Sequence, residues 1–250
     1  PLMSSISSFS QNSNIVIAGA NGGIGSALVN ALADDERAAR IWALSRTPVA
    51  ADSPRVESIV TDITEESAIA SAAKQCSEHG PIDLVIVAAG ILHDGKKIQP
   101  EKRMRDFDGA AMAEVFRINT IAPALLAKHF LPRMRRDAKS AFAAISARVG
   151  SIGDNRLGGW GSYRASKAAL NMLIKTLAIE HARTHDEGIV VSLHPGTTDT
   201  PLSKPFQRNV PEDKLFAPGF TAKRLLQVLD GLGSEDSGGF FAWDGQAIEY

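Results

Sequence analysis

Short apolar runs alternate along the chain with longer segments in which apolar residues recur every three or four positions. The runs cover 14–19, 40–45, 57–62, 83–90, 141–146 and 188–196, and several are continuous rather than alternating. Continuous apolar runs are typical of strands buried on both faces of a parallel sheet. The intervening segments, 25–35, 64–80, 110–136 and 166–184, have the pattern of helices. The sequence therefore predicts an α/β fold, a doubly wound parallel sheet with helices on both faces.

No linker, repeat or low-complexity tract divides the chain, so residues 14–250 are expected to form a single domain. Residues 1–13 are mostly polar, and Pro-Leu before Met3 resembles a cleavage scar, so this stretch is expected to be a flexible tail. A long polar segment at about 198–218 contains four prolines. A segment of this kind is expected to be a mobile substrate loop.

Composition and charge narrow the class of protein. Lys and Arg number 27 against 28 Asp and Glu, and the net charge of −1 gives no overall attraction to nucleic acid or to an acidic membrane. No apolar run approaches the length of a membrane span. The single cysteine, Cys76, fits a reducing compartment, and the six histidines lack metal-ligand spacing. We therefore expect a cytoplasmic protein that binds no nucleic acid, membrane or metal.

A glycine-rich turn follows the first predicted strand, in the sequence IVIAGANGGIGSALV. Gly19, Gly23 and Gly25 have the spacing G-x-x-x-G-x-G. Glycines let the backbone turn sharply and approach a pyrophosphate, whose charge is met by N–H groups at the following helix N-terminus. A tight connection would also use glycines. The position after the first strand of a β–α–β unit favours a dinucleotide site, and with it a Rossmann fold.

The end of the second predicted strand indicates which dinucleotide is bound. An NAD site usually has Asp or Glu there, whereas this strand ends in Ser45 and Arg46. A carboxylate would repel the 2′-phosphate of NADP, and an arginine can hold that phosphate through two parallel hydrogen bonds. The sequence therefore predicts NADP as cofactor, with NADPH preferred over NADH.

Seven short motifs follow one another in a familiar order. They are GANGGIG, TDIT after the third strand, AAG after the fourth, Asn119 within a helix, a serine region after the fifth strand, YRASK opening a helix, and HPGTTDT after the sixth strand. From Asn14 onward the chain resembles the short-chain dehydrogenase/reductase family. The stretches ISARVGSI, GGWGSYRASKAALN and GGFFAWDGQ are most similar to its C-factor and sniffer-type carbonyl reductase branch.

The resemblance implies an oxidoreductase that interconverts a small carbonyl compound and its alcohol, and a homo-oligomer, either a dimer or a tetramer. It places Asp62 and Ile63 beside the adenine, and Pro195, Gly196 and Thr200 beside the nicotinamide. The family motif at AAG usually begins with asparagine, which Ala88 replaces. The implied cofactor-binding residues are Gly19, Asn21, Gly22, Gly23, Ile24, Gly25, Ser45, Arg46, Asp62, Ile63, Ala88, Ala89, Gly90, Tyr163, Lys167, Pro195, Gly196, Thr197 and Thr200.

Tyr163 and Lys167 are four residues apart, so on a helix both side chains lie on one face. Such a pair alone is common on helix surfaces, and the surrounding motifs favour a catalytic role. A nearby ammonium lowers the pKa of a phenol, which is ordinarily near 10. We expect Tyr163 to donate a proton to the substrate oxygen while Lys167 tunes it and binds the nicotinamide ribose. The resemblance gives Asn119 the role of holding a water.

The serine that orients the substrate in this family lies three residues before a glycine, a position that Ala147 occupies here. Ser146 is one residue earlier, and Ser151 follows that glycine, Gly150. A neighbouring residue in a strand points to the opposite face, although a bulge or the start of a loop can redirect it. We expect Ser146 to take this role, with Ser151 or no serine as the alternatives.

The departure at Ala147 leaves a second hypothesis open, a cofactor-binding signalling or regulatory protein with little turnover. Tyr163, Lys167 and Asn119 favour an enzyme. Two further features have open interpretations. Trp160 either lines the substrate pocket or packs in the core, and the basic stretch 93–105 is either a solvated loop or a contact for an acidic ligand. The identity of the substrate does not follow from the sequence.

Overall fold

The computed structural model describes residues 6–250 and contains a parallel sheet of seven strands in the order β3-β2-β1-β4-β5-β6-β9. The chain fills one half of the sheet and then the other, so the order reverses between β1 and β4. Ligands of such sheets bind at this switch point, beyond the carboxyl ends of the strands. The strands are β1 (Ser13–Ala18), β2 (Ala38–Ser45), β3 (Val56–Val60), β4 (Leu84–Val87), β5 (Ser140–Ile145), β6 (Gly188–His194) and β9 (Phe240–Ala242).

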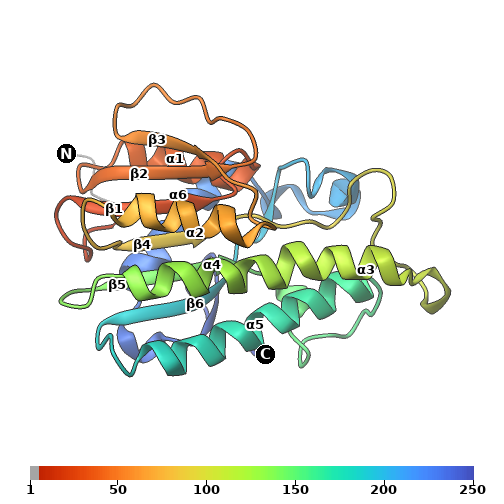
Figure 1. The fold of residues 1–250 in the computed structure, drawn as a ribbon. Helices are drawn as coiled ribbons and strands as arrows, with labels where there is room; N and C mark the ends of the chain where they lie inside the picture. Colours follow the sequence, from red (N-terminus) through yellow and green to blue (C-terminus); the bar gives the residue numbers. More distant parts are fainter. Residues whose placement is uncertain (1–5) are drawn as a thin grey trace.

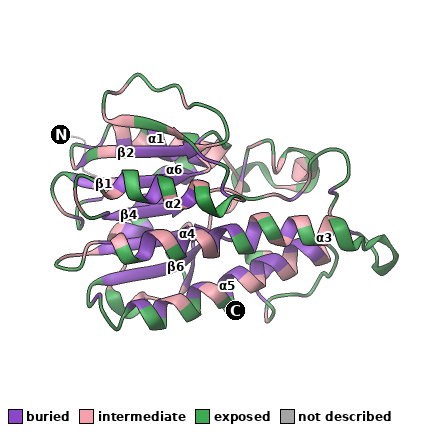
Figure 2. Cartoon of the chain, in the orientation of Figure 1, coloured by how far each residue is buried: buried purple, intermediate pink, exposed green. Residues whose placement is uncertain are grey.

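Helices cover both faces of the sheet, as predicted (Figure 1). The helices are α1 (Gly23–Ala33), α2 (Glu66–Ser77), α3 (Gly109–Phe116), α4 (Ala122–Phe130), α5 (Gly161–His181) and α6 (Pro218–Gly231). Alternate strand residues face opposite layers, so Ile15 and Ile17 pack with α1 and α6, while Val16 packs with α2, α4 and α5. Figure 2 shows the result: the central strands are buried, the edge strand β3 is partly exposed, and the outer faces of the helices are exposed.

The helical stretch Gly109–Arg133 has the length and apolar composition of a membrane span, contrary to the expectation that no segment approaches it. Leu126 and Phe130 of this stretch are fully buried in the core cluster on the α4 side of the sheet. A core helix of a folded domain has the same composition. Packing within the domain therefore accounts for the buried apolar side chains of this stretch.

The prediction of a flexible tail is wrong for residues 6–13. Ile6 and Phe9 are buried in the core, and the guanidinium of Arg37 donates a hydrogen bond of 2.8 Å to the carbonyl of Phe9. Ser13 already begins β1. These few apolar side chains fill the core beside α1 and α6, which the polar composition of the stretch concealed. The rest of the predicted tail, residues 1–5, lies outside the described residues.

The segment 198–218 is not featureless. It contains two 3-10 helices, Lys204–Asn209 and Glu212–Lys214, and the strand β8 (Leu215–Phe216), which pairs with β7 (Thr197–Thr198). Its mobility stays a prediction.

Candidate active site

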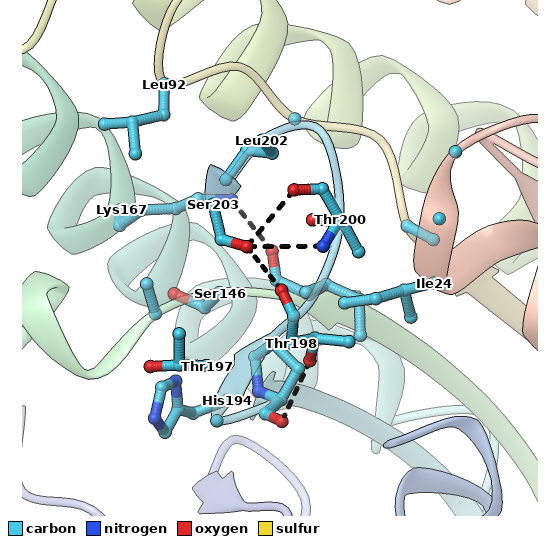
Figure 3. A pocket seen from close by; sticks show the side chains of 18 of the residues that line it. Ile24, Leu92, Ser146, Lys167, His194, Thr197, Thr198, Thr200, Leu202 and Ser203 are labelled. Atoms are coloured by element: carbon cyan, nitrogen blue, oxygen red, sulfur yellow. Dashed lines mark hydrogen bonds between the residues drawn. The ribbon is translucent and has the colours of Figure 1, made fainter. Parts of the chain in front are cut away.

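A cavity of about 640 Å³ opens at the carboxyl ends of the central strands, where the strand order reverses (Figure 3). It brings together residues from the loops after β1, β4, β5 and β6, from the start of α5 and from the segment 198–218. Of the predicted site residues, it is lined by Asn21, Gly22, Gly23, Ile24, Ala88, Ala89, Gly90, Ser146, Tyr163, Lys167, Pro195, Gly196, Thr197 and Thr200.

The glycine turn forms the wall of the cavity at the N-terminus of α1. Gly19 has φ +87°, and a Cβ on Gly25 would lie 2.1 Å from the Gly19 carbonyl oxygen, so neither position accepts a side chain. No side chain caps α1 and no acidic residue lies in its first turn. The main-chain N–H groups there are thus available to an anion. The turn fits a pyrophosphate, although Gly19 and Gly25 shape it without lining the cavity.

Tyr163 and Lys167 project from the first two turns of α5 and are 8% and 3% exposed. The Lys167 ammonium donates a hydrogen bond of 2.8 Å to the carbonyl of Ile145 and lies 5.8 Å from the centre of the Tyr163 ring. Burial raises the pKa of Tyr163 to about 12 and lowers that of Lys167 to about 8. Burial thus shifts the pKa of the phenol upward, opposite to the lowering expected from a nearby ammonium. With a pKa of about 12, Tyr163 is protonated at neutral pH.

Asn119 lies in a π-helical turn, Arg117–Ile121, between α3 and α4. Its fully buried amide accepts a hydrogen bond from the Ile91 N–H and donates one to the Ile91 carbonyl, both 2.8 Å long. It also donates to the Ser166 hydroxyl at 3.1 Å. These bonds join the loop after β4 to α5. Asn119 therefore supports the site from outside the cavity, and its role in holding a water stays a prediction.

The two candidate serines differ in what their hydroxyls contact. Ser146 follows the last residue of β5, where the strand gives way to a loop, and its main-chain N–H still donates to Leu193. Its side chain lines the cavity, is buried, and has no hydrogen-bond partner among the described residues. The Ser151 hydroxyl accepts a bond of 3.1 Å from the Asp154 N–H and lies outside the cavity lining. This geometry favours Ser146.

The ends of β2 and β3 lie beside the glycine turn but outside the cavity lining. The Asn21 side chain donates to the Thr47 hydroxyl at 2.8 Å, and Thr61 N–H donates to the Ser45 carbonyl at 2.8 Å. Asp62 and Ile63 follow directly after Thr61. The predicted adenine-side residues, Ser45, Arg46, Asp62 and Ile63, are therefore neighbours at one end of the site.

Arg46 is exposed and makes no hydrogen bond or ion pair with the described residues. The carboxylate of Asp62 instead accepts two bonds from Thr64, one from its N–H at 2.9 Å and one from its hydroxyl at 2.7 Å. These bonds, with a smaller contribution from Arg46 and Arg117, lower the pKa of Asp62. The Arg46 guanidinium is thus free to bind an anion.

The cavity also has lining residues that were not singled out from the sequence. It is mainly apolar, and Phe206 from the segment 198–218 packs edge-on against Trp160, with ring centres 5.0 Å apart. His194, one of the six histidines without metal-ligand spacing, lines the cavity, and its Nδ1 accepts a bond of 3.2 Å from the Arg148 N–H. Burial lowers the pKa of His194 to about 4. The lining residues not predicted are Leu92, Ile145, Ala147, Arg148, Val149 and His194. The predicted substrate loop contributes Thr198, Pro201, Leu202, Ser203, Phe206 and Val210.

Comparison with known proteins agrees with this architecture. The sequence profile described as short chain dehydrogenase matches residues 13–211. C-signal of Myxococcus xanthus is 35% identical over 68% of this chain and 94% of its own. The 1-hydroxy-2-glutathionyl-2-methyl-3-butene dehydrogenase of Rhodococcus sp. is 33% identical over 76% and 78% of the two chains. The NADPH-bound carbonyl reductase from chicken fatty liver superimposes with a TM-score of 0.82 at 26% identity, covering 98% and 97%.

Proposed function

The chain belongs to the short chain dehydrogenase family, and on that premise we propose that it is an NADPH-dependent carbonyl reductase, which interconverts a small carbonyl compound and its alcohol. One observation carries the proposal. A buried tyrosine and lysine of α5 and the unpartnered hydroxyl of Ser146 line the same cavity as the glycine turn. The NADPH-bound carbonyl reductase that superimposes on this chain supports it.

The cofactor supplies a hydride. The first turn of α1 would hold its pyrophosphate, and Arg46 its 2′-phosphate, because both present donors that no described side chain occupies. Lys167 would bind the nicotinamide ribose. Asp62 and Ile63 would flank the adenine, while the residues after β6, Pro195, Gly196, Thr197 and Thr200, would border the nicotinamide.

In the reductive direction Tyr163 donates its phenolic proton to the carbonyl oxygen of the substrate. The raised pKa of Tyr163 keeps that proton in place at neutral pH until the oxygen develops negative charge. The Ser146 hydroxyl, which has no partner among the described residues, donates a hydrogen bond to the same oxygen and fixes its position. In the oxidative direction Tyr163 takes the proton from the alcohol as a phenolate, a form that the Lys167 ammonium and the positive charge of the oxidised nicotinamide would stabilise against the effect of burial.

Tyr163→Phe tests the proposal, because it removes the proton donor and keeps the ring. We expect turnover of NADPH with a panel of aldehydes, ketones and quinones to be lost, with NADPH binding retained. Tyr250→Phe is the matched control, since the chain has two tyrosines and the Tyr250 hydroxyl bonds the Gly238 carbonyl. Wild-type turnover in Tyr163→Phe, or tight NADPH binding with no turnover by the wild type, would contradict the proposed function.

The alternative of a regulatory protein with little turnover is not the one we propose. It depended on Ala147, which stands where the family places a serine, and Ser146 supplies a hydroxyl to the cavity from the adjacent position. The resemblance to C-signal leaves a signalling role as the outcome to consider if NADPH binds without turnover. Assembly into a dimer or tetramer and a cytoplasmic location stay predictions.

A further inference from the structure

Glu101 is a buried acid that the proposed chemistry does not use. It lies in the basic stretch 93–105, for which a solvated loop was one interpretation, and its neighbours Lys102 and Arg103 are exposed. Glu101 itself is only 7% exposed. A buried carboxylate is costly unless it is hydrogen-bonded, so its partners show what it stabilises.

Those partners are all at the N-terminus of α5. One carboxylate oxygen of Glu101 accepts a hydrogen bond of 3.1 Å from the Ser162 N–H, and the other accepts the Ser162 hydroxyl. The main-chain carbonyl of Glu101 accepts a bond of 2.6 Å from the Trp160 N–H. Glu101 therefore holds Ser162, the residue directly before Tyr163, and Trp160, the residue directly before the helix begins.

The start of α5 requires such support, because its own sequence supplies little. The helix begins after Trp160, whose side chain makes no capping bond and whose φ of +54° is uncommon for any residue other than glycine. Gly158 and Gly159 before it also have positive φ, +63° and +68°. The first N–H groups of a helix have no partners within the helix, and an anion there also complements the helix dipole. Glu101 fills this role from 61 residues away.

We propose that Glu101 is a positioning residue that caps α5 from another part of the chain and thereby fixes the Tyr163 hydroxyl for proton transfer. The proposal rests on the proposed function of Tyr163. Removal of the cap would free the first turn of α5, and a displacement of about 1 Å at a reacting group can lower a rate about 100-fold. The proposed contacts to the phosphates of NADPH come from α1 and the end of β2. Lys167, the proposed contact to the ribose, lies in the second turn of α5, beyond the first-turn N–H groups that need the cap, so NADPH binding would be unaffected.

Steady-state kinetics of Glu101→Ala and Glu101→Gln test this role. We expect Glu101→Ala to lower kcat about 100-fold, with KM and NADPH affinity unchanged. Glu101→Gln retains an acceptor oxygen but loses the charge-assisted bond, so its loss of kcat should be smaller. Asp83→Asn is the matched control. Asp83 is a fully buried carboxylate that accepts the Asn14 N–H at 2.8 Å, and it precedes β4, at the opposite edge of the sheet from the cavity.

The control should lower the melting temperature without changing kcat. The proposal is overturned if Glu101→Ala keeps the wild-type kcat, or if Asp83→Asn loses as much kcat as Glu101→Ala. Should Glu101→Ala fail to fold, Glu101→Gln and Ser162→Ala decide, and wild-type kcat in both would overturn it.

A second readout does not depend on turnover. In a Tyr250→Phe background Tyr163 is the remaining tyrosine, so NMR of tyrosine isotope-labelled at Cζ gives one resonance. Glu101→Ala should shift or split this resonance, and Asp83→Asn should not. Absence of turnover in the wild type would refute the proposed function, whereas an unmoved resonance in Glu101→Ala would refute the positioning role.

Discussion

Arg46→Ala tests the predicted cofactor preference at a single side chain. The guanidinium follows β2, is exposed, and makes no ion pair with the described residues, while Asp62 nearby is hydrogen-bonded to Thr64. Hydrogen bonds to a charged group contribute about 1.5–3 kcal/mol. Because the guanidinium is exposed to solvent, we take a value of about 2 kcal/mol, which at 1.4 kcal/mol per factor of ten corresponds to about 30-fold in Kd.

The assay is titration of the protein with NADPH and with NADH, followed by the fluorescence of the nicotinamide. We expect Arg46→Ala to weaken NADPH binding about 30-fold and to leave NADH binding unchanged. Added salt should narrow the wild-type preference, because exposed charges are screened. Arg40→Ala is the matched control. Arg40 lies within β2, six residues before Arg46, and pairs with Glu57 at 3.1 Å. Equal weakening of both cofactors, or a wild type that binds NADH more tightly, would refute the reasoning.

Two further predictions concern the serine and the stability of the fold. Ser146→Ala should lower turnover about 100-fold, which is the effect of removing one hydrogen-bond donor to a developing oxyanion. Ser151→Ala should leave turnover unchanged. The opposite result would assign the role to Ser151. Burial holds the pKa of His181 at about 4, against 6.5 in the unfolded chain. The unfolded chain therefore binds the proton first as pH falls, and His181 by itself should lower the free energy of unfolding by about 2 kcal/mol between neutral pH and pH 5, in addition to the loss due to the likewise buried His194. Urea unfolding measures this: His181→Gln should reduce the pH-dependent loss by about 2 kcal/mol, and His79→Gln, a change at an exposed histidine, should leave it unchanged. An undiminished loss in His181→Gln would contradict the prediction.

The parts of the fold that were predicted from the sequence are those with local signals. Continuous apolar runs revealed β1, β2, β4, β5 and β6, because a strand buried on both faces needs apolar residues at nearly every position. The edge strand β3, whose residues are partly or fully exposed, gave a shorter apolar run. The three-residue strand β9 and the helix α6 were not assigned. β9 pairs with β6 through Ser192–His194, and a strand this short has too few positions to show a pattern. β9 forms because β6, which pairs with β5 on one side, has hydrogen-bonding groups on its other side that a further strand can pair with.

The parts of the site that were predicted from the sequence are likewise those with local signals. The glycine turn and the Tyr163–Lys167 pair each lie within a few residues of sequence, so their spacing alone places them on a turn and on one helix face. The upward shift of the Tyr163 pKa by burial was not predicted, since burial depends on everything packed around the phenol. The choice of Ser146 over Ser151 depends on which hydroxyl is already hydrogen-bonded, to Asp154 in the case of Ser151. The sequence alone does not show which hydroxyl is hydrogen-bonded.

The sequence by itself determined the α/β class, the order of the strands along the chain, the glycine turn and the pair on α5, because each is encoded by residues close in sequence. Tertiary structure alone decided that Ile6 and Phe9 belong to the core, that Phe206 meets Trp160 across the cavity, and that Glu101 caps the helix carrying Tyr163. These contacts join residues from separate segments of the chain. Periodicity describes which face of its own element a residue occupies, and only the packing of elements determines what that face meets.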